Sequence, residues 1–340
     1  MLADILLTAV NAVFPMVLLI LLGYFLKQRG FFSEDFLDIG NALVFNVCMP
    51  CMLFVNIYEI SGIGAIAWDL VLYCCIAIVV LFVLGLVAAV VTTGVPNRRG
   101  VIWQSCFRSN YAIIGLPLAA VLGGAEATAI AAVVSAMAIP LFNIFGVIAL
   151  SVFADGKDRR IRLRQILLDI VKNPLILGVA AGLICLVLRA IQQQVFGEVV
   201  FALDTQLSFL YTVAENLNVI TSPFAMLILG AQFTFRAVRG LTREILVGTL
   251  MRIVVAPILC IGGAVILNEL GWIACGSREL PAMLALFGTP VAVSSAIMAQ
   301  QMKSDGQLAT QLVVWTSVGS IVTIFAAVCI LMFAGLLPAA

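Results

Sequence analysis

The sequence predicts an all-α polytopic membrane protein with ten transmembrane helices in two inverted five-helix repeats. Three observations lead to this prediction: the composition, the lengths of the apolar segments and the placement of the basic residues. Of the 340 residues, 64% are hydrophobic and 10% are charged, whereas soluble globular proteins average about 45–50% apolar and about 25% charged residues. A chain with so few charges is expected to lie mostly in lipid.

Apolar segments of spanning length occur ten times along the chain. A helix needs about 20 predominantly apolar residues to cross the hydrocarbon core. Segments of this kind are expected near residues 5–26, 36–57, 67–93, 101–122, 127–153, 167–189, 207–234, 243–267, 280–301 and 308–335. The fourth and ninth contain proline and glycine, which a plain spanning helix does not need. We therefore expect helices 4 and 9 to be broken and to face the protein interior.

Basic residues gather in every second connection between these segments. Lys27 and Arg29 follow the first segment, Arg98 and Arg99 precede the fourth, and five basic residues lie within residues 154–166. The intervening connections are acidic or neutral, with one exception. Because short loops rich in lysine and arginine stay in the cytoplasm, residues 154–166 are predicted to form a cytoplasmic loop and both termini to lie outside.

The two halves of the chain carry proline in corresponding segments. Pro50 and Pro223 lie in the second segment of each half, and Pro117 and Pro290 lie in the fourth. Interrupted helices at matching positions of inverted repeats mark a transport site. The alternative is that these prolines reflect only the high frequency of proline in membrane helices. The predicted units are the first repeat (residues 1–153), the cytoplasmic loop (residues 154–166) and the second repeat (residues 167–340).

Several classes of function are disfavoured by what the sequence lacks. The net charge of +1 argues against a nucleic-acid partner, and the absence of histidine excludes a histidine proton relay. The nine cysteines are interpreted as small apolar packing residues. The sequence has no nucleotide-binding loop and no metal-ligand cluster. We therefore expect neither an enzyme nor a bound cofactor or metal.

The clearest candidate site surrounds the fourth segment, which reads FRSNYAIIGLPLAA from Phe107 to Ala120. Arg108 lies roughly 10 Å into the segment at 1.5 Å per residue, and its planar guanidinium suits a carboxylate. The alternative for Arg108 is a side chain that snorkels to the inner headgroups or makes a structural contact.

Both breaks are expected to contribute further protein groups that bind the ligand. Half-helices that start at Pro117 and Pro290 would direct their positively polarised N-termini at an anion. Asn110 is expected to bind either the ligand or freed backbone groups, and Ser294 and Ser295 either offer hydroxyls or serve as small packing residues. The predicted substrate-binding residues are Arg108, Asn110, Tyr111, Gly115, Pro117, Pro290, Val291, Ser294 and Ser295.

Polar residues in the seventh segment offer a second type of site. Glu215 could titrate during transport, lie beside a cation or have no role. Asn216 and Asn218 follow it, and Asn46 in the second segment is the nearest counterpart of Asn218. These four residues are predicted as possible coupling or scaffold contacts. Arg252, in the eighth segment, is interpreted as a structural arginine that binds carbonyl groups at a helix end.

Motifs along nearly the whole chain resemble those of the auxin efflux carrier family. They are F-R-x-N followed by G-L-P-L-A in the fourth segment, N-A-L-V-F-N-V-C-M-P in the second, N-P-L-I-L-G-V-A-A-G-L in the sixth, P-F-A-M-L-I-L-G-A in the seventh and P-V-A-V-S-S-A-I-M-A-Q-Q in the ninth. The resemblance implies that the broken helices cross at Pro117 and Pro290. It places Asn110 at the position of the family's substrate-contacting asparagine.

The resemblance also implies a mechanism and a setting. Helices 3–5 and 8–10 would move like an elevator against a scaffold of helices 1, 2, 6 and 7. Members of the family carry organic anions such as auxin, malate or malonate, and they are often dimers. The long cytoplasmic loop of the plant exporters is replaced here by the short stretch at residues 154–166. We therefore expect a homodimeric, bacterial-type member in the inner membrane, with both termini in the periplasm.

Three functional hypotheses follow from these observations. The first is a transporter of a small organic anion, driven by ion coupling or by the membrane potential. The second is a sodium- or proton-coupled symporter of a neutral or bile-acid-like solute, which would use Glu215 and the neighbouring asparagines. The third is a membrane sensor that retains the transporter fold without transport. The expected partners are the solute, the lipid bilayer and a second copy of the chain.

Overall fold

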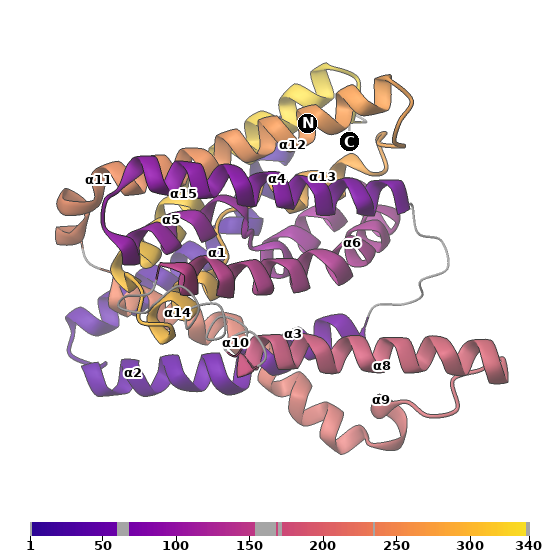
Figure 1. The fold of residues 1–340 in the computed structure, drawn as a ribbon, viewed down its shortest axis with the longest axis horizontal. Coiled ribbons are helices and arrows are strands. Elements are labelled where there is room, and N and C mark those ends of the chain that lie inside the picture. Colours follow the sequence, from indigo (N-terminus) through magenta and orange to yellow (C-terminus); the bar gives the residue numbers. More distant parts are fainter. Residues whose placement is uncertain (1, 60–67, 154–167, 169–171, 234, 338–340) are drawn as a thin grey trace.

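The computed structural model describes residues 2–59, 68–153, 168, 172–233 and 235–337. Every regular element in these residues is a helix (Figure 1), which confirms the predicted all-α class. The one β-type contact among them is an isolated antiparallel bridge between Ser109 and Val291. The predicted cytoplasmic loop at residues 154–166 lies outside the described residues.

Helices occur in each of the ten predicted apolar segments. In the first half they are α1 (Leu2–Gln28), α2 (Glu34–Leu43), α3 (Met49–Tyr58), α4 (Trp68–Thr92), α5 (Pro96–Phe107) and α6 (Leu116–Val152). In the second half they are α8 (Pro174–Phe196), α9 (Leu203–Gln206), α10 (Ser208–Gln232), α11 (Phe235–Leu250), α12 (Ala256–Glu269), α13 (Leu280–Phe287), α14 (Val293–Gln301) and α15 (Gly306–Phe333). Three π-helical turns adjoin them: η1 (Val44–Cys48), η2 (Tyr111–Gly115) and η3 (Met251–Val255).

Seven continuous helices in the described residues are long and apolar enough to cross a membrane. They are Glu34–Tyr58, Trp68–Thr92, Glu126–Val152, Pro174–Phe196, Ser208–Gln232, Val238–Glu269 and Gly306–Phe333. The helices α5, α13 and α14 have 12, 8 and 9 residues, too few to span alone. The count of ten spans and the inverted repeat therefore remain predictions.

One helix ends well beyond its predicted limit. The sixth apolar segment was expected to end at residue 189, but α8 continues to Phe196 through a polar stretch. Arg189 anchors this stretch, because its Nη1 donates to the Tyr58 carbonyl at 2.8 Å and its guanidinium lies 4.9 Å from the centre of the Tyr58 ring. Contacts with a neighbouring helix thus extend α8 past the point where its apolar pattern stops.

Each π-helical turn ends two residues before a proline. η1 precedes Pro50, η2 precedes Pro117 and η3 precedes Pro257. Proline lacks the backbone N–H that an α-helix requires, and its ring collides with the carbonyl group one turn earlier. The wider π turn relieves this conflict without ending the helix. Such turns are frequent at functional sites.

The fourth and ninth segments are both interrupted, as predicted, but the break in the fourth segment does not lie at Pro117. α5 ends at Phe107, and Arg108 is extended with φ −85° and ψ 103°. Pro117 lies instead in the first turn of α6. The second break separates α13 from α14 and does contain Pro290.

The expected crossing at Pro117 is therefore corrected to residues 108–110. The π turn η2 absorbs Pro117, so this proline does not break the helix. Ser109 and Asn110 favour the break instead, because short polar side chains compete with the helical hydrogen bonds of the backbone.

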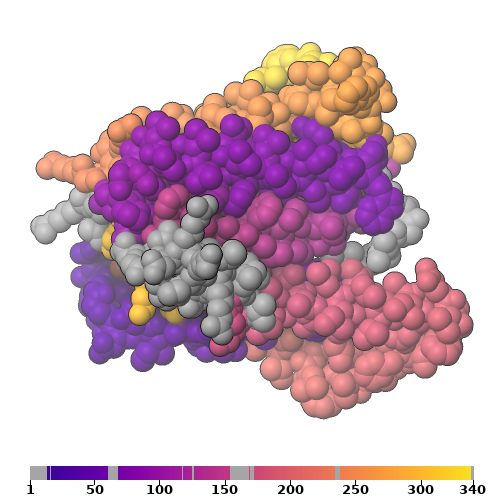
Figure 2. Space-filling model, viewed as in Figure 1, coloured from indigo at the N-terminus to yellow at the C-terminus, as the bar shows by residue number. Residues whose placement is uncertain are grey.

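The helices form two groups with α14 between them (Figure 1). One group contains α2, α3, α8, α9 and α10, and the other contains α4, α5, α6, α11, α12 and α13. In the space-filling view, a notch on the right separates the α8–α10 region from the rest of the molecule (Figure 2). α14 packs against α10 and η1 from the first group and against α5 from the second. The half-helix that follows the second break thus lies where the groups meet.

Glycines allow α1 and α10 to pack with their backbones in contact. A Cβ atom added at Gly230 would lie 1.8 Å from the Ile20 carbonyl oxygen, and one added at Gly23 would lie 2.0 Å from the Leu227 carbonyl oxygen. Small residues at such contacts are how membrane helices gain close packing. The two glycines therefore fix the distance between α1 and α10.

We expect the substitution Gly230→Ala to lower the Tm of the purified protein by roughly 2–5 °C. Overpacking costs about 1–3 kcal/mol or more, and the obstructing atom belongs to a helix backbone that cannot rotate away. Gly262→Ala is the matched control, because a Cβ atom there meets no atom within 4 Å and alanine favours the helix. Equal melting temperatures for the two variants, measured by differential scanning fluorimetry, would contradict this expectation.

Candidate functional site

The two helix breaks lie side by side and pair with each other. Asn110 N donates to the Pro290 carbonyl at 2.8 Å, and Ala292 N donates to the Arg108 carbonyl at 3.3 Å. These bonds supply partners for backbone groups that a continuous helix would satisfy internally. The two interrupted helices therefore meet, as the sequence predicts, although the first meets the second at residues 108–110.

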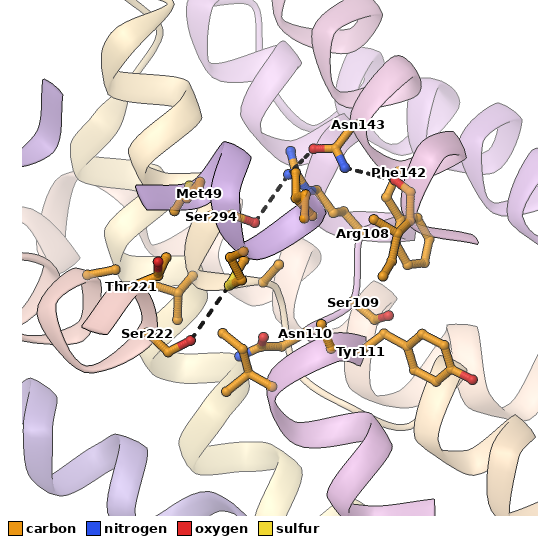
Figure 3. Close-up of a pocket in the computed structure, with 18 residues that line it drawn as sticks. Met49, Arg108, Ser109, Asn110, Tyr111, Phe142, Asn143, Thr221, Ser222 and Ser294 are labelled. Carbon is orange, nitrogen blue, oxygen red and sulfur yellow. Dashed lines mark hydrogen bonds between the residues drawn. The ribbon is translucent and has the colours of Figure 1, made fainter. Parts of the chain in front are cut away.

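A small cavity of about 50 Å³ lies against the paired breaks (Figure 3). It is lined by α3, by the first break and η2, by α6, by α10, and by the second break with the start of α14. Its polar lining residues are Arg108, Ser109, Asn110, Tyr111, Asn143, Thr221, Ser222 and Ser294. One water needs about 10–15 Å³ by this kind of measure, so the cavity suits several waters or a small solute.

Arg108 forms one wall of this cavity and is buried, with 3% of its surface exposed. Its Nη2 donates to Asn143 Oδ1 at 2.9 Å and to Ser294 Oγ at 3.2 Å, and its Nη1 donates to Met298 Sδ at 2.7 Å. Figure 3 shows Arg108, Asn143 and Ser294 converging on one side of the cavity, with Thr221 and Ser222 on the opposite side. The alternative of a side chain that snorkels to the headgroups is therefore wrong.

The partners of the Arg108 guanidinium are all neutral. In the described part of the chain, no carboxylate forms an ion pair with it. Burial of a cation without an opposite charge is strongly unfavourable, and neutral hydrogen bonds offset only part of the lost hydration. An anion in the cavity would supply the missing charge.

Asn143 on α6 holds the guanidinium in place, and it is not among the site residues predicted from the sequence. Its Nδ2 donates to the Ile139 carbonyl at 2.8 Å, which turns its Oδ1 towards Arg108. Gly146, one turn further along α6, makes room for Arg108, because a Cβ atom there would lie 2.9 Å from Arg108 Nη1. The signal that could have found Asn143 is an amide within an apolar spanning segment.

Four of the nine predicted substrate-binding residues line the cavity: Arg108, Asn110, Tyr111 and Ser294. The hydroxyl of Tyr111 is directed away from Arg108 (Figure 3) and donates to the Ala131 carbonyl at 2.8 Å. The predicted residues that are not part of the lining are Gly115, Pro290, Val291 and Ser295, and the side chain of Pro117 lies outside the described part of the structure.

Pro290 and Val291 take part in the pairing of the breaks through their backbones, and an antiparallel bridge joins Val291 to Ser109. The Pro290 carbonyl accepts from Asn110, and Val291 N donates to Thr316 Oγ1 of α15 at 3.1 Å. Ser295 lies in the first turn of α14, and its carbonyl accepts from Gln104 Nε2 at 3.0 Å. These residues contribute to the shape of the site and not to its lining.

The four predicted coupling residues do not line the cavity. Glu215 and Asn216 are exposed on α10, and Asn218 is half-buried. Asn46 is exposed on η1, and its Nδ2 donates to the Ala42 carbonyl of its own helix at 2.8 Å. The part of α10 that faces the cavity instead presents Thr221 and Ser222, which follow Asn216 and Asn218 along the helix.

Helices of spanning length that surround paired helix breaks define the class of multi-pass membrane transporters. A family model described as membrane transport protein matches residues 8–327. The chain therefore belongs to this family, the auxin efflux carriers, which confirms the resemblance drawn from its motifs. No curated protein matches the chain.

Proposed function

We propose that this protein carries a small organic anion across the membrane by alternating access of the elevator type. The observation that carries the proposal is the buried guanidinium of Arg108 at the cavity, whose partners among the described residues are neutral. A carboxylate matches the planar donor geometry of arginine. Its charge would offset the desolvation of Arg108, so binding would be favourable for anions and not for neutral solutes.

The helix termini at the breaks favour an anion as well. α14 begins immediately after Ala292, and η2 begins immediately after Asn110 and continues into α6. The N-terminus of a helix carries about half a positive elementary charge and unpaired N–H groups. The residues that precede these two N-termini, Asn110 and Ala292, line the cavity. The partial positive charges of the N-termini therefore add to the charge of Arg108.

The size of the cavity favours small solutes over bile-acid-like ones. About 50 Å³ accommodates a short mono- or dicarboxylate better than a steroid skeleton. Glu215, on which the cation-coupled alternative depends, is exposed and not part of the cavity lining. The geometry thus supports the anion transporter more than the symporter of a neutral or bile-acid-like solute.

Hydrogen bonds between side-chain amides link α14 to its neighbours, and they are weak enough to allow α14 to move. Asn41 Nδ2 of α2 donates to Gln300 Oε1 of α14 at 2.6 Å, and Gln300 Nε2 donates to Gln232 Oε1 of α10 at 2.7 Å. These bonds join α14 to α2 and α10, two helices of the first group, near the predicted cytoplasmic end of α14. Because each neutral hydrogen bond contributes only about 0.5–1.5 kcal/mol net, the contact can break and reform in a transport cycle.

A thermal-shift screen of the purified protein tests the proposed ligand class. We expect short carboxylates such as malonate and malate to raise the Tm, because a ligand present at about 100 times its Kd stabilises the native state by about 2.7 kcal/mol. Malonamide is the matched neutral control and should leave the Tm unchanged. Equal shifts with malonate and malonamide, or no shift with any carboxylate, would contradict the proposal.

A further inference from the structure

Arg252 in η3 is fully buried and donates to four backbone carbonyl groups. Its Nε donates to Thr289 O at 2.9 Å, and its Nη1 donates to Phe107 O at 3.3 Å. Its Nη2 donates to Leu286 O and to Phe287 O, both at 3.0 Å. These bonds confirm the interpretation of Arg252 as an arginine that binds carbonyl groups at a helix end.

The four carbonyl groups belong to both of the helices that lead into the site. Phe107 is the last residue of α5 and directly precedes Arg108, and Phe287 is the last residue of α13. Thr289 directly precedes Pro290. One side chain therefore joins the two halves of the chain at the points where their helices break. It projects from a π turn, an element that is frequent at functional sites.

The positive charge of Arg252 is opposite in sign to the partial charge of the helix ends that it binds. The C-terminus of a helix carries about half a negative elementary charge. Two such ends meet here, so about one negative charge would otherwise lie beside the cavity and repel an anion. In the described residues no carboxylate pairs with Arg252, so its positive charge is available to cancel that of the two helix ends.

We infer that Arg252 is a positioning residue for the transported anion: it holds the two C-terminal helix ends together and cancels their negative charge. Cancellation leaves the positive field of Arg108 and of the two helix N-termini to act on the ligand. This inference rests on the proposed function, because it requires the ligand to be an anion.

Two substitutions separate the charge of Arg252 from its hydrogen bonds. Arg252→Lys keeps the charge with fewer donors, and Arg252→Gln keeps an amide donor without the charge. We expect both variants to have a lower Tm and faster hydrogen exchange at residues 108–110 and 288–292. The Kd for malonate, from a thermal-shift titration, should rise about tenfold in Arg252→Gln and less than about threefold in Arg252→Lys. A purely structural role would raise both Kd values equally or neither.

The results distinguish this inference from the proposed function. A wild type that binds malonate, together with equal Kd values in both variants, would overturn the role of Arg252 alone. A wild type without affinity for any carboxylate would overturn the proposed function and this inference with it. If Arg252→Gln does not fold, Arg252→Lys decides: a Kd within threefold of the wild type, with faster exchange at both breaks, supports the inference. A tenfold higher Kd in this variant, or exchange that is unchanged at either break, overturns it.

Discussion

The substitution Arg108→Gln is expected to abolish carboxylate uptake into proteoliposomes while leaving the protein folded. Arg108 is the cation at the cavity, and glutamine keeps a polar group of similar reach without its charge. Removal of one partner from a buried charge pair costs about 2–5 kcal/mol, which corresponds to a loss of affinity of roughly 30-fold to several thousand-fold. Uptake of radiolabelled malonate and the malonate-dependent thermal shift measure this loss.

Two further variants make the experiment on Arg108 specific. Arg278→Gln is the matched control, because Arg278 forms an ion pair with Glu126 at 3.0 Å in which the two side chains are 70% and 56% exposed. Such surface pairs contribute little, so uptake should not change. Arg108→Lys keeps the charge but loses the planar donor fork, and its uptake should lie between those of the wild type and Arg108→Gln. Wild-type uptake by Arg108→Gln would remove Arg108 from the site.

The positions of the helices could be predicted because the bilayer imposes their length. Hydrocarbon requires about 20 apolar residues per span, and each of the ten segments found in this way contains helix. The second break was also predictable, because Pro290 cannot donate a helical hydrogen bond. The first break was misplaced, because the conformational choice near Pro117 depends on the π turn η2 and on pairing with the second break, which is 180 residues away in the chain.

The candidate site was predictable only where a single residue contrasts with its surroundings. Arg108 is a charge inside an apolar segment, and Asn110 and Ser294 are polar residues beside a break. Asn143 reaches Arg108 from another helix, and this contact depends on how α6 crosses the first break. The contact between Arg108 and Met298 could not be predicted from the sequence either, because a methionine in an apolar segment is usually a core residue. The environment of a charge depends on tertiary packing, which local sequence patterns do not contain.

Asn143→Asp provides a test in which a negative charge is placed beside Arg108. The aspartate would lie within about 3 Å of the guanidinium, at the position of an oxygen that already accepts from Arg108 Nη2 at 2.9 Å. An internal carboxylate would neutralise Arg108 and compete with the transported anion. We therefore expect Asn143→Asp to lose malonate uptake about as completely as Arg108→Gln, with a Tm equal to or above that of the wild type.

Asn143→Ala separates this effect from the loss of the amide. Both substitutions remove the hydrogen bond from Nδ2 to the Ile139 carbonyl, but only aspartate adds a negative charge. A lost hydrogen bond to a charged group costs about 1.5–3 kcal/mol, so Asn143→Ala should raise the KM for malonate on the order of tenfold and retain transport. If Arg108 had only a structural role, the aspartate would supply the same acceptor and transport would survive better than in Asn143→Ala. The order of activities in these two variants therefore decides whether the charge of Arg108 serves the solute or the fold.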